Sequence, residues 1–231
     1  MTSDITRRHN DRGVDTVAIF IDGSNLYHSL EENCRRFDVD FAAFSNKLCE
    51  GRSLLRTYYY NILRDPERNP QAYQDQQKFL SALDNTPYLE VRLGGSKLRG
   101  DVAVEKGVDI MLATDLLQFG WQNLYDVAIL VSGDGDFAYA VQAVKDMGKH
   151  VEVAAFPANL SGELAQVADV CELFTPDYFS ELWSRRRGGV RGGTQAPDAA
   201  RRSRRGVRAR ATESNRGDKQ TSPKEINAGA E

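Results

Sequence analysis

Short apolar runs alternate along this chain with longer segments in which apolar residues recur every three or four positions. The runs at 17–21 (VAIFI) and 127–131 (VAILV) are apolar throughout, which is typical of parallel strands buried on both faces. The segments between the runs have the spacing of amphipathic helices. We predict strands over 17–21, 53–62, 88–93, 127–131, 150–155 and 170–174, and helices after 25 and over about 39–51, 72–83, 107–119, 137–147 and 160–167.

This alternation of strands and helices predicts an α/β fold, a three-layer sandwich with a mostly parallel central sheet. We expect Gly94 and Gly95 to end the strand at 88–93, and 96–106 to form a basic loop or arm. The predicted organisation is a disordered lead-in over 1–15, one domain over 16–183 and a tail over 184–231. The tail has almost no large apolar residues, so it is expected to be disordered.

Charge is divided unevenly between the predicted domain and the tail. The tail has 13 Lys and Arg against 5 Asp and Glu (+8), which leaves 17 against 28 (−11) in residues 1–183. An acidic body does not suit phosphate binding by itself, unless its carboxylates hold divalent cations and added basic segments hold the nucleic acid. The three cysteines show no metal or disulfide spacing, and no apolar run is long enough to cross a membrane. We therefore expect a soluble, cytoplasmic protein.

Four aspartates are predicted to face one edge of the sheet. Asp22 and Asp134 follow the two most apolar strands, Asp136 lies two residues later at a helix start, and Asp109 falls in the first turn of the helix that follows Gly107. Clustered carboxylates suit Mg²⁺ or Mn²⁺, and such a site can activate water for attack on a phosphate. Each aspartate also has an ordinary structural explanation as a helix cap or turn residue, and for Asp136 capping is about as favoured as function.

Two further polar residues lie close to these positions in the sequence. Asn25 follows Asp22 by three residues, so its amide could orient a metal-bound water or a phosphate, or make a helix-start hydrogen bond. Asp115 lies about 120° around the helix from Asp109 and nearly two turns away, which places it outside the metal site.

Other chemistries fit the chain poorly. The SGDGDF segment at 132–137 lacks the glycine and glutamate of a calcium loop, the three histidines are scattered, and neither G-x-S-x-G nor G-x-G-x-x-G occurs. A phosphotransfer or phosphatase site on small molecules would favour D-x-D after the first strand, whereas Gly23 and Ser24 follow Asp22.

Three ordered segments, VAIFIDGSNLY, EKGVDIMLATDLL and ILVSGDGDFAYAVQAVKDMGKHVEV, resemble the NYN domain of the PIN-like nuclease superfamily, closest to its LabA-like branch. The resemblance covers about residues 16–175. It implies a PIN-like sandwich and metal-dependent RNA cleavage. By motif position it implies that catalysis involves Asp22, Asn25, Asp109, Asp134 and Asp136, and that the four aspartates hold the metal. Asp115 also matches a position that the family tends to keep acidic.

We therefore expect an endoribonuclease that uses Mg²⁺ or Mn²⁺, and the alternative is a non-catalytic regulatory module that binds RNA or a protein. Lys97, Arg99 and Lys106 flank the expected site and are the predicted RNA-binding residues. The Arg-rich tail could tether RNA or serve only as a solvated segment. Expected partners are RNA, and a second copy or another protein through the tail, but no membrane.

Overall fold

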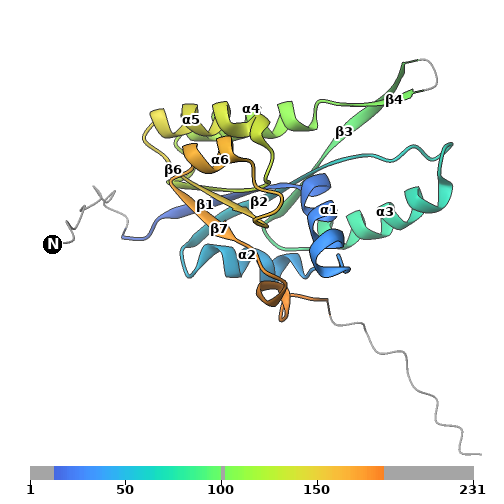
Figure 1. The fold of residues 1–231 in the computed structure, drawn as a ribbon, viewed down its shortest axis with the longest axis horizontal. Coiled ribbons are helices and arrows are strands. Elements are labelled where there is room, and N and C mark those ends of the chain that lie inside the picture. The colour runs from blue at the N-terminus through green and yellow to red at the C-terminus, as the bar shows by residue number, and fades with distance from the viewer. Residues whose placement is uncertain (1–12, 100–101, 185–231) are drawn as a thin grey trace, which may run out of the picture. The chain divides into compact units, whose positions relative to one another are not determined.

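The computed structural model describes residues 13–99 and 102–184 of the chain. In that part, seven strands form one sheet in the order β4-β3-β2-β1-β5-β6-β7 (Figure 1). The strands are β1 (Thr16–Asp22), β2 (Ser53–Ile62), β3 (Leu89–Arg99), β4 (Val102–Lys106), β5 (Val127–Val131), β6 (His150–Ala155) and β7 (Val170–Leu173). Six of them, from β3 to β7, run parallel, as the alternating pattern predicts.

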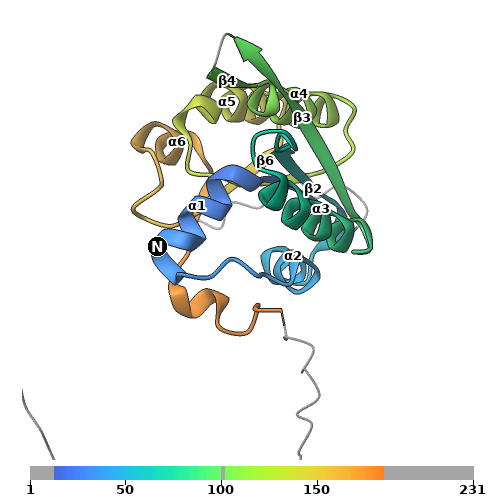
Figure 2. The same ribbon diagram turned by 90° about the vertical axis from the view of Figure 1, so that its right-hand side faces the viewer.

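Helices cover both faces of this sheet, which confirms the three-layer α/β sandwich (Figure 2). The helices are α1 (Gly23–Cys34), α2 (Phe41–Cys49), α3 (Pro70–Asp84), α4 (Val108–Trp121), α5 (Ala138–Asp146) and α6 (Gly162–Val167), with 3-10 turns η1 (Gly135–Phe137) and η2 (Pro176–Phe179). One core lies between the sheet and α1, α2 and α3, and the other lies between the sheet and α4, α5 and α6. The central strands β1 and β5 are buried on both sides because each face has its own helical layer.

The predicted end of the third strand at Gly94 and Gly95 is wrong. The strand β3 continues to Arg99, and 102–106 returns as the antiparallel strand β4, so the segment predicted as a loop or arm is a hairpin. Gly94 still pairs with Ile62 of β2, and Gly95 pairs with Lys106. Pairing on both sides compensates for the low strand preference of glycine.

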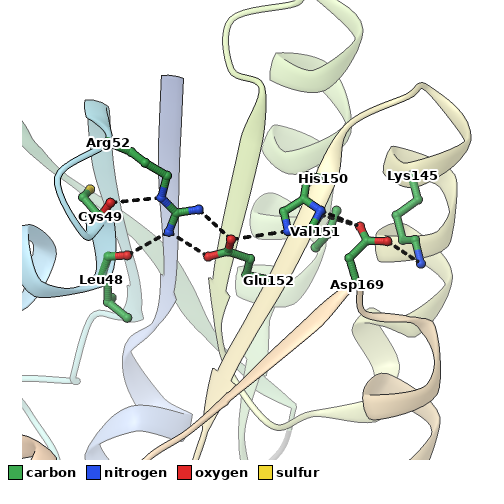
Figure 3. Close-up of polar contacts among 8 residues, drawn as sticks. All are labelled: Leu48, Cys49, Arg52, Lys145, His150, Val151, Glu152 and Asp169. Carbon is green, nitrogen blue, oxygen red and sulfur yellow. Dashed lines mark hydrogen bonds and ion pairs between the residues drawn. The ribbon is translucent and has the colours of Figure 1, made fainter. Parts of the chain in front are cut away.

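A chain of charged side chains joins several elements at the amino-terminal edge of the sheet (Figure 3). Arg52 donates to Glu152 at 2.9 Å and to the carbonyls that end α2. His150 lies 3.4 Å from Glu152 and 3.5 Å from Asp169, which pairs with Lys145 at 3.1 Å. Burial pushes the pKa of Glu152 upward, but the bonds from His150 and Arg52 outweigh it and lower that pKa to about 2. The network therefore links the end of α2 to β6 and α5 at the edge opposite the aspartates.

No helix in the two described ranges combines the length and the apolar character that a membrane span needs.

Candidate metal and phosphate site

The strands that carry Asp22 and Asp134 are direct neighbours. β1 pairs with β5 in parallel from Val17 with Val127 to Ile21 with Val131. After β1 the chain crosses to β2 on one side, and after β5 it crosses to β6 on the other. The connections that leave these two strands therefore diverge at their carboxyl ends, which is the usual ligand position in open α/β sheets.

Asp22 ends β1 and is the N-cap of α1. Its Oδ1 accepts the Asn25 backbone N–H at 3.0 Å, and its Oδ2 accepts the Ser132 hydroxyl at 3.2 Å. The side chain is almost fully buried, with 6% of the residue exposed. Burial raises the pKa of Asp22, the two hydrogen bonds lower it, and the carboxylates of Asp109 and Asp134 raise it again, with a net rise. Asp22 is thus a carboxylate whose negative charge the surrounding protein disfavours.

Backbone and side-chain hydrogen bonds order the SGDGD turn that follows β5. The Ser132 hydroxyl accepts the Asp134 N–H at 3.2 Å, and the Asp134 carboxylate accepts the Asp136 N–H at 3.0 Å. Asp134, not Asp136, is therefore the residue that caps η1, and the side chain of Asp136 is exposed. Asn25 Oδ1 accepts the Gly133 N–H at 3.2 Å, so the amide of Asn25 ties α1 to this turn.

Close backbone contacts require glycine at two positions of the site. A Cβ on Gly133 would lie 1.9 Å from the carbonyl oxygen of Asn159, and a Cβ on Gly23 would lie 2.4 Å from the ring of Tyr59. The Gly133 carbonyl also accepts the Ser161 N–H at 2.9 Å. These contacts hold the two Asp-bearing turns against β2 and the 159–161 loop.

Asp109 lies in the first turn of α4 and is exposed, on the same rim as the two turns. Its carboxylate is close enough to raise the pKa of Asp22, as is that of Asp134. Within the parts of the chain that the structure describes, however, no three His, Cys, Asp or Glu side chains lie where they could hold one metal ion together. The oxygen donors suit Mg²⁺ chemically, since Mg²⁺ is commonly held by one or two carboxylates and keeps several waters. The rim fits such an ion better than it fits a closed protein cage.

Asp115 has a structural environment of its own. It is buried on α4, accepts the hydroxyl of Tyr60 at 2.8 Å and forms an ion pair with Arg92. Tyr60 is the register partner of Asp22 on β2, and Arg92 is the register partner of Tyr60 on β3. Asp115 therefore fastens α4 to the strands beside Asp22, in agreement with its predicted position outside the metal site.

The NYN domain model matches residues 16–174 of this chain. The chain belongs to the NYN domain family. This is a PIN-like nuclease family whose nucleases typically use divalent metals. The low amplitude and bright protein LabA of Synechococcus elongatus is 30% identical over 161 residues, which are 66% of this chain and 80% of LabA. This chain also matches a solved structure, that of a Vibrio parahaemolyticus protein of unknown function, with a TM-score of 0.61 and 25% sequence identity. The match covers 73% of this chain and 98% of the Vibrio chain.

The predicted RNA-binding residues of this NYN domain lie on the β3–β4 hairpin, Lys97 and Arg99 on β3 and Lys106 on β4. Their side chains lie outside the described part of the structure, as do the predicted tail and residues 1–12. The backbone places the hairpin at one edge of the sheet, beside the carboxyl end of β2. These three residues thus remain predictions as RNA contacts.

Two residues of the rim were not predicted from the sequence. Ser132 bridges Asp22 and Asp134; its position directly after a buried strand places it at the same edge of the sheet as Asp22, but no local pattern indicates the bond between them. Arg64 follows β2 by two residues and is exposed. Burial raises the pKa of the Tyr59 hydroxyl and Asp22 raises it further, whereas Arg64 lowers it. The exposed Arg64 lies just beyond the carboxyl end of β2, the strand that pairs with β1.

Proposed function

We propose that this NYN domain is an endoribonuclease that depends on Mg²⁺ or Mn²⁺. The observation that carries the proposal is the buried Asp22 carboxylate, held at the switch point of the sheet and raised in pKa by burial and by the facing Asp109 and Asp134. A cation at this rim would offset the repulsion among these carboxylates. The family relationship supports nuclease chemistry at the same edge.

In this proposal Asp22 and Asp134 bind the cation directly, and Asp109 and the exposed Asp136 contribute through its bound waters. A bound divalent cation supplies positive charge that stabilises the phosphate oxygens during hydrolysis. Asp22 is oriented by α1 and by the Ser132 hydroxyl, so little reorientation is needed before it binds. Asn25 uses its carbonyl oxygen on Gly133, which leaves its N–H₂ group to donate to a phosphate oxygen.

Substrate binding must overcome the negative charge of the domain. Arg64 is suited to contact a phosphate at this edge of the sheet, because it is exposed and follows the carboxyl end of β2, the strand beside β1. Lys97, Arg99 and Lys106 on the neighbouring hairpin, together with the arginine-rich tail, are proposed to add sequence-independent contacts. Such contacts weaken as salt concentration rises.

One observation favours a second function, a regulatory module that binds RNA or a protein without cleavage. No three potential ligands among the described residues are gathered around one position. An enzyme whose cation binds together with the substrate phosphate would also need fewer than three protein ligands, because the phosphate supplies some of the oxygen ligands.

The test is cleavage of labelled RNA by the purified full chain in EDTA, Mg²⁺ or Mn²⁺, together with Mn²⁺ titration calorimetry. We expect cation-dependent cleavage that Asp22→Asn and Asp134→Asn abolish. Asp84→Asn is the matched control, because Asp84 is exposed and lies at the last residue of α3. Unchanged cleavage in Asp22→Asn or Asp134→Asn would refute the assignment. RNA binding without cleavage or Mn²⁺ uptake would support the regulatory module.

A further inference from the structure

A large aromatic side chain stands in solvent directly beside the aspartates of the rim. Tyr139 is 87% exposed and is the second residue of α5. It follows Asp136 by three residues, and η1 continues without interruption into α5. Residues three apart on a helical turn share a face, so the ring of Tyr139 is adjacent to the exposed Asp136.

An exposed apolar side chain also lies at the start of the neighbouring helix. Ile110 is 72% exposed and follows Asp109 in the first turn of α4. α4 and α5 lie side by side on one face of the sheet (Figure 1), and both begin at its carboxyl edge. Trp121 is also an exposed aromatic residue, but it is the last residue of α4 and lies about 20 Å from the start of that helix.

The chemistry of this position selects one class of ligand. A ring beside a phosphate-binding rim can meet the face of a base whose phosphate occupies that rim. In a duplex these faces are covered by neighbouring base pairs, whereas in a single strand they are free to stack on an aromatic side chain. Stacking needs no charge on the ring, so it operates within an acidic surface.

We propose that Tyr139 stacks against an unpaired base next to the phosphate bound at the rim. This inference rests on the proposed function for the location of the phosphate. It adds a contact that discriminates single strands from duplexes and that involves no carboxylate.

The test measures binding separately from cleavage. The full chain carrying Asp22→Asn, which under the proposed function abolishes turnover, is titrated into a fluorescein-labelled oligouridylate of roughly a dozen nucleotides and into the same strand paired with oligoadenylate. Adding Tyr139→Ala is expected to weaken single-strand binding roughly five- to 150-fold, and Tyr139→Phe to preserve it because the ring face remains. Trp121→Ala, an equally exposed aromatic at the far end of α4, is the matched control and should change nothing.

Equal single-strand binding by the Asp22→Asn chain with and without Tyr139→Ala would overturn the inference. It would also be overturned by equal losses of affinity for the single strand and the duplex, or by no binding of the single strand to the Asp22→Asn chain. A Tyr139→Trp variant gives a second readout, since quenching of the indole emission by the oligonucleotide is expected on stacking. If the protein binds single-stranded RNA through Tyr139 but the unsubstituted chain never cleaves RNA, the nuclease proposal is refuted and the stacking contact is supported.

Discussion

The Ser132 hydroxyl connects the two turns of the candidate site, and removing it tests how the site is held. It donates to Asp22 Oδ2 and accepts the Asp134 N–H, both at 3.2 Å, and Ser132 is 1% exposed. Water has no ready access to replace either bond. Ser132→Ala would therefore remove the hydroxyl partner of Asp22 Oδ2 and of the Asp134 backbone N–H, and water would replace it only in part.

The expected cost follows from these two bonds. A hydrogen bond to a charged group contributes about 1.5–3 kcal/mol and a neutral one about 0.5–1.5 kcal/mol, so Ser132→Ala should lower the free energy of unfolding by about 2–4.5 kcal/mol at neutral pH. Urea unfolding measures this difference. Because the hydroxyl lowers the pKa of Asp22, its removal raises that pKa further, and the cost should shrink as acidification protonates Asp22.

A double-mutant cycle with Asp22→Asn isolates the interaction between Ser132 and the carboxylate. With a neutral amide at position 22, Ser132→Ala should cost about 1 kcal/mol less than in the parent. Ser24→Ala is the matched control, because Ser24 lies on the same turn and its hydroxyl contacts Asn61 at 3.4 Å. A cost below about 0.5 kcal/mol, or equal costs in both backgrounds, would refute the bridging role.

Three further predictions concern charge and packing. Asp22→Asn should be more stable than the parent at neutral pH, because burial raises the pKa of Asp22 above 3.8. The stabilising contribution of Asp22 is therefore present below pH 3.8 and is lost as the pH rises through the raised pKa. Urea unfolding across this pH range should show a flatter dependence of stability on pH for the variant. Glu152→Gln should lower the free energy of unfolding by roughly 2–3 kcal/mol at pH 7, since the depressed pKa of about 2 contributes stability above pH 4.5 that disappears as the pH falls toward 2. Thermal unfolding of the parent and the variant at pH 7 and pH 2 tests this, and an equal difference in stability at the two pH values would contradict it. Gly133→Ala should lose about 1–3 kcal/mol because its Cβ would meet the Asn159 carbonyl oxygen at 1.9 Å, whereas Gly162→Ala, which has no atom within 4 Å of a Cβ, should be tolerated in the same denaturation assay.

Local patterns were sufficient to predict most elements of the sheet. The strand predicted over 53–62 coincides with β2, and the two fully apolar runs form the adjacent central strands β1 and β5. Such patterns are reliable here because strands buried on both faces need apolar residues at every position. The turn residues Asp22 and Asp134 follow from the same reasoning, since each comes directly after one of these strands.

The errors arose where partners distant in sequence decide the structure. Gly94 and Gly95 remain in β3 because β2 and β4 pair with them, which their own low strand preference does not indicate. The bridge from Ser132 to Asp22 joins residues 110 positions apart, so no local pattern predicts it.

The sequence by itself determined most of the strands and helices and the identity of the acidic residues that follow them, because these depend on periodicity and local turn chemistry. Only the tertiary structure decided that β1 lies beside β5, that Asp22 is buried against Ser132, and that Asp115 pairs with Tyr60 and Arg92. These relations depend on long-range packing, which sets the distances between charges and their exposure to water. It is this packing that raises the pKa of Asp22 and leaves the described carboxylates facing one rim without a closed metal cage.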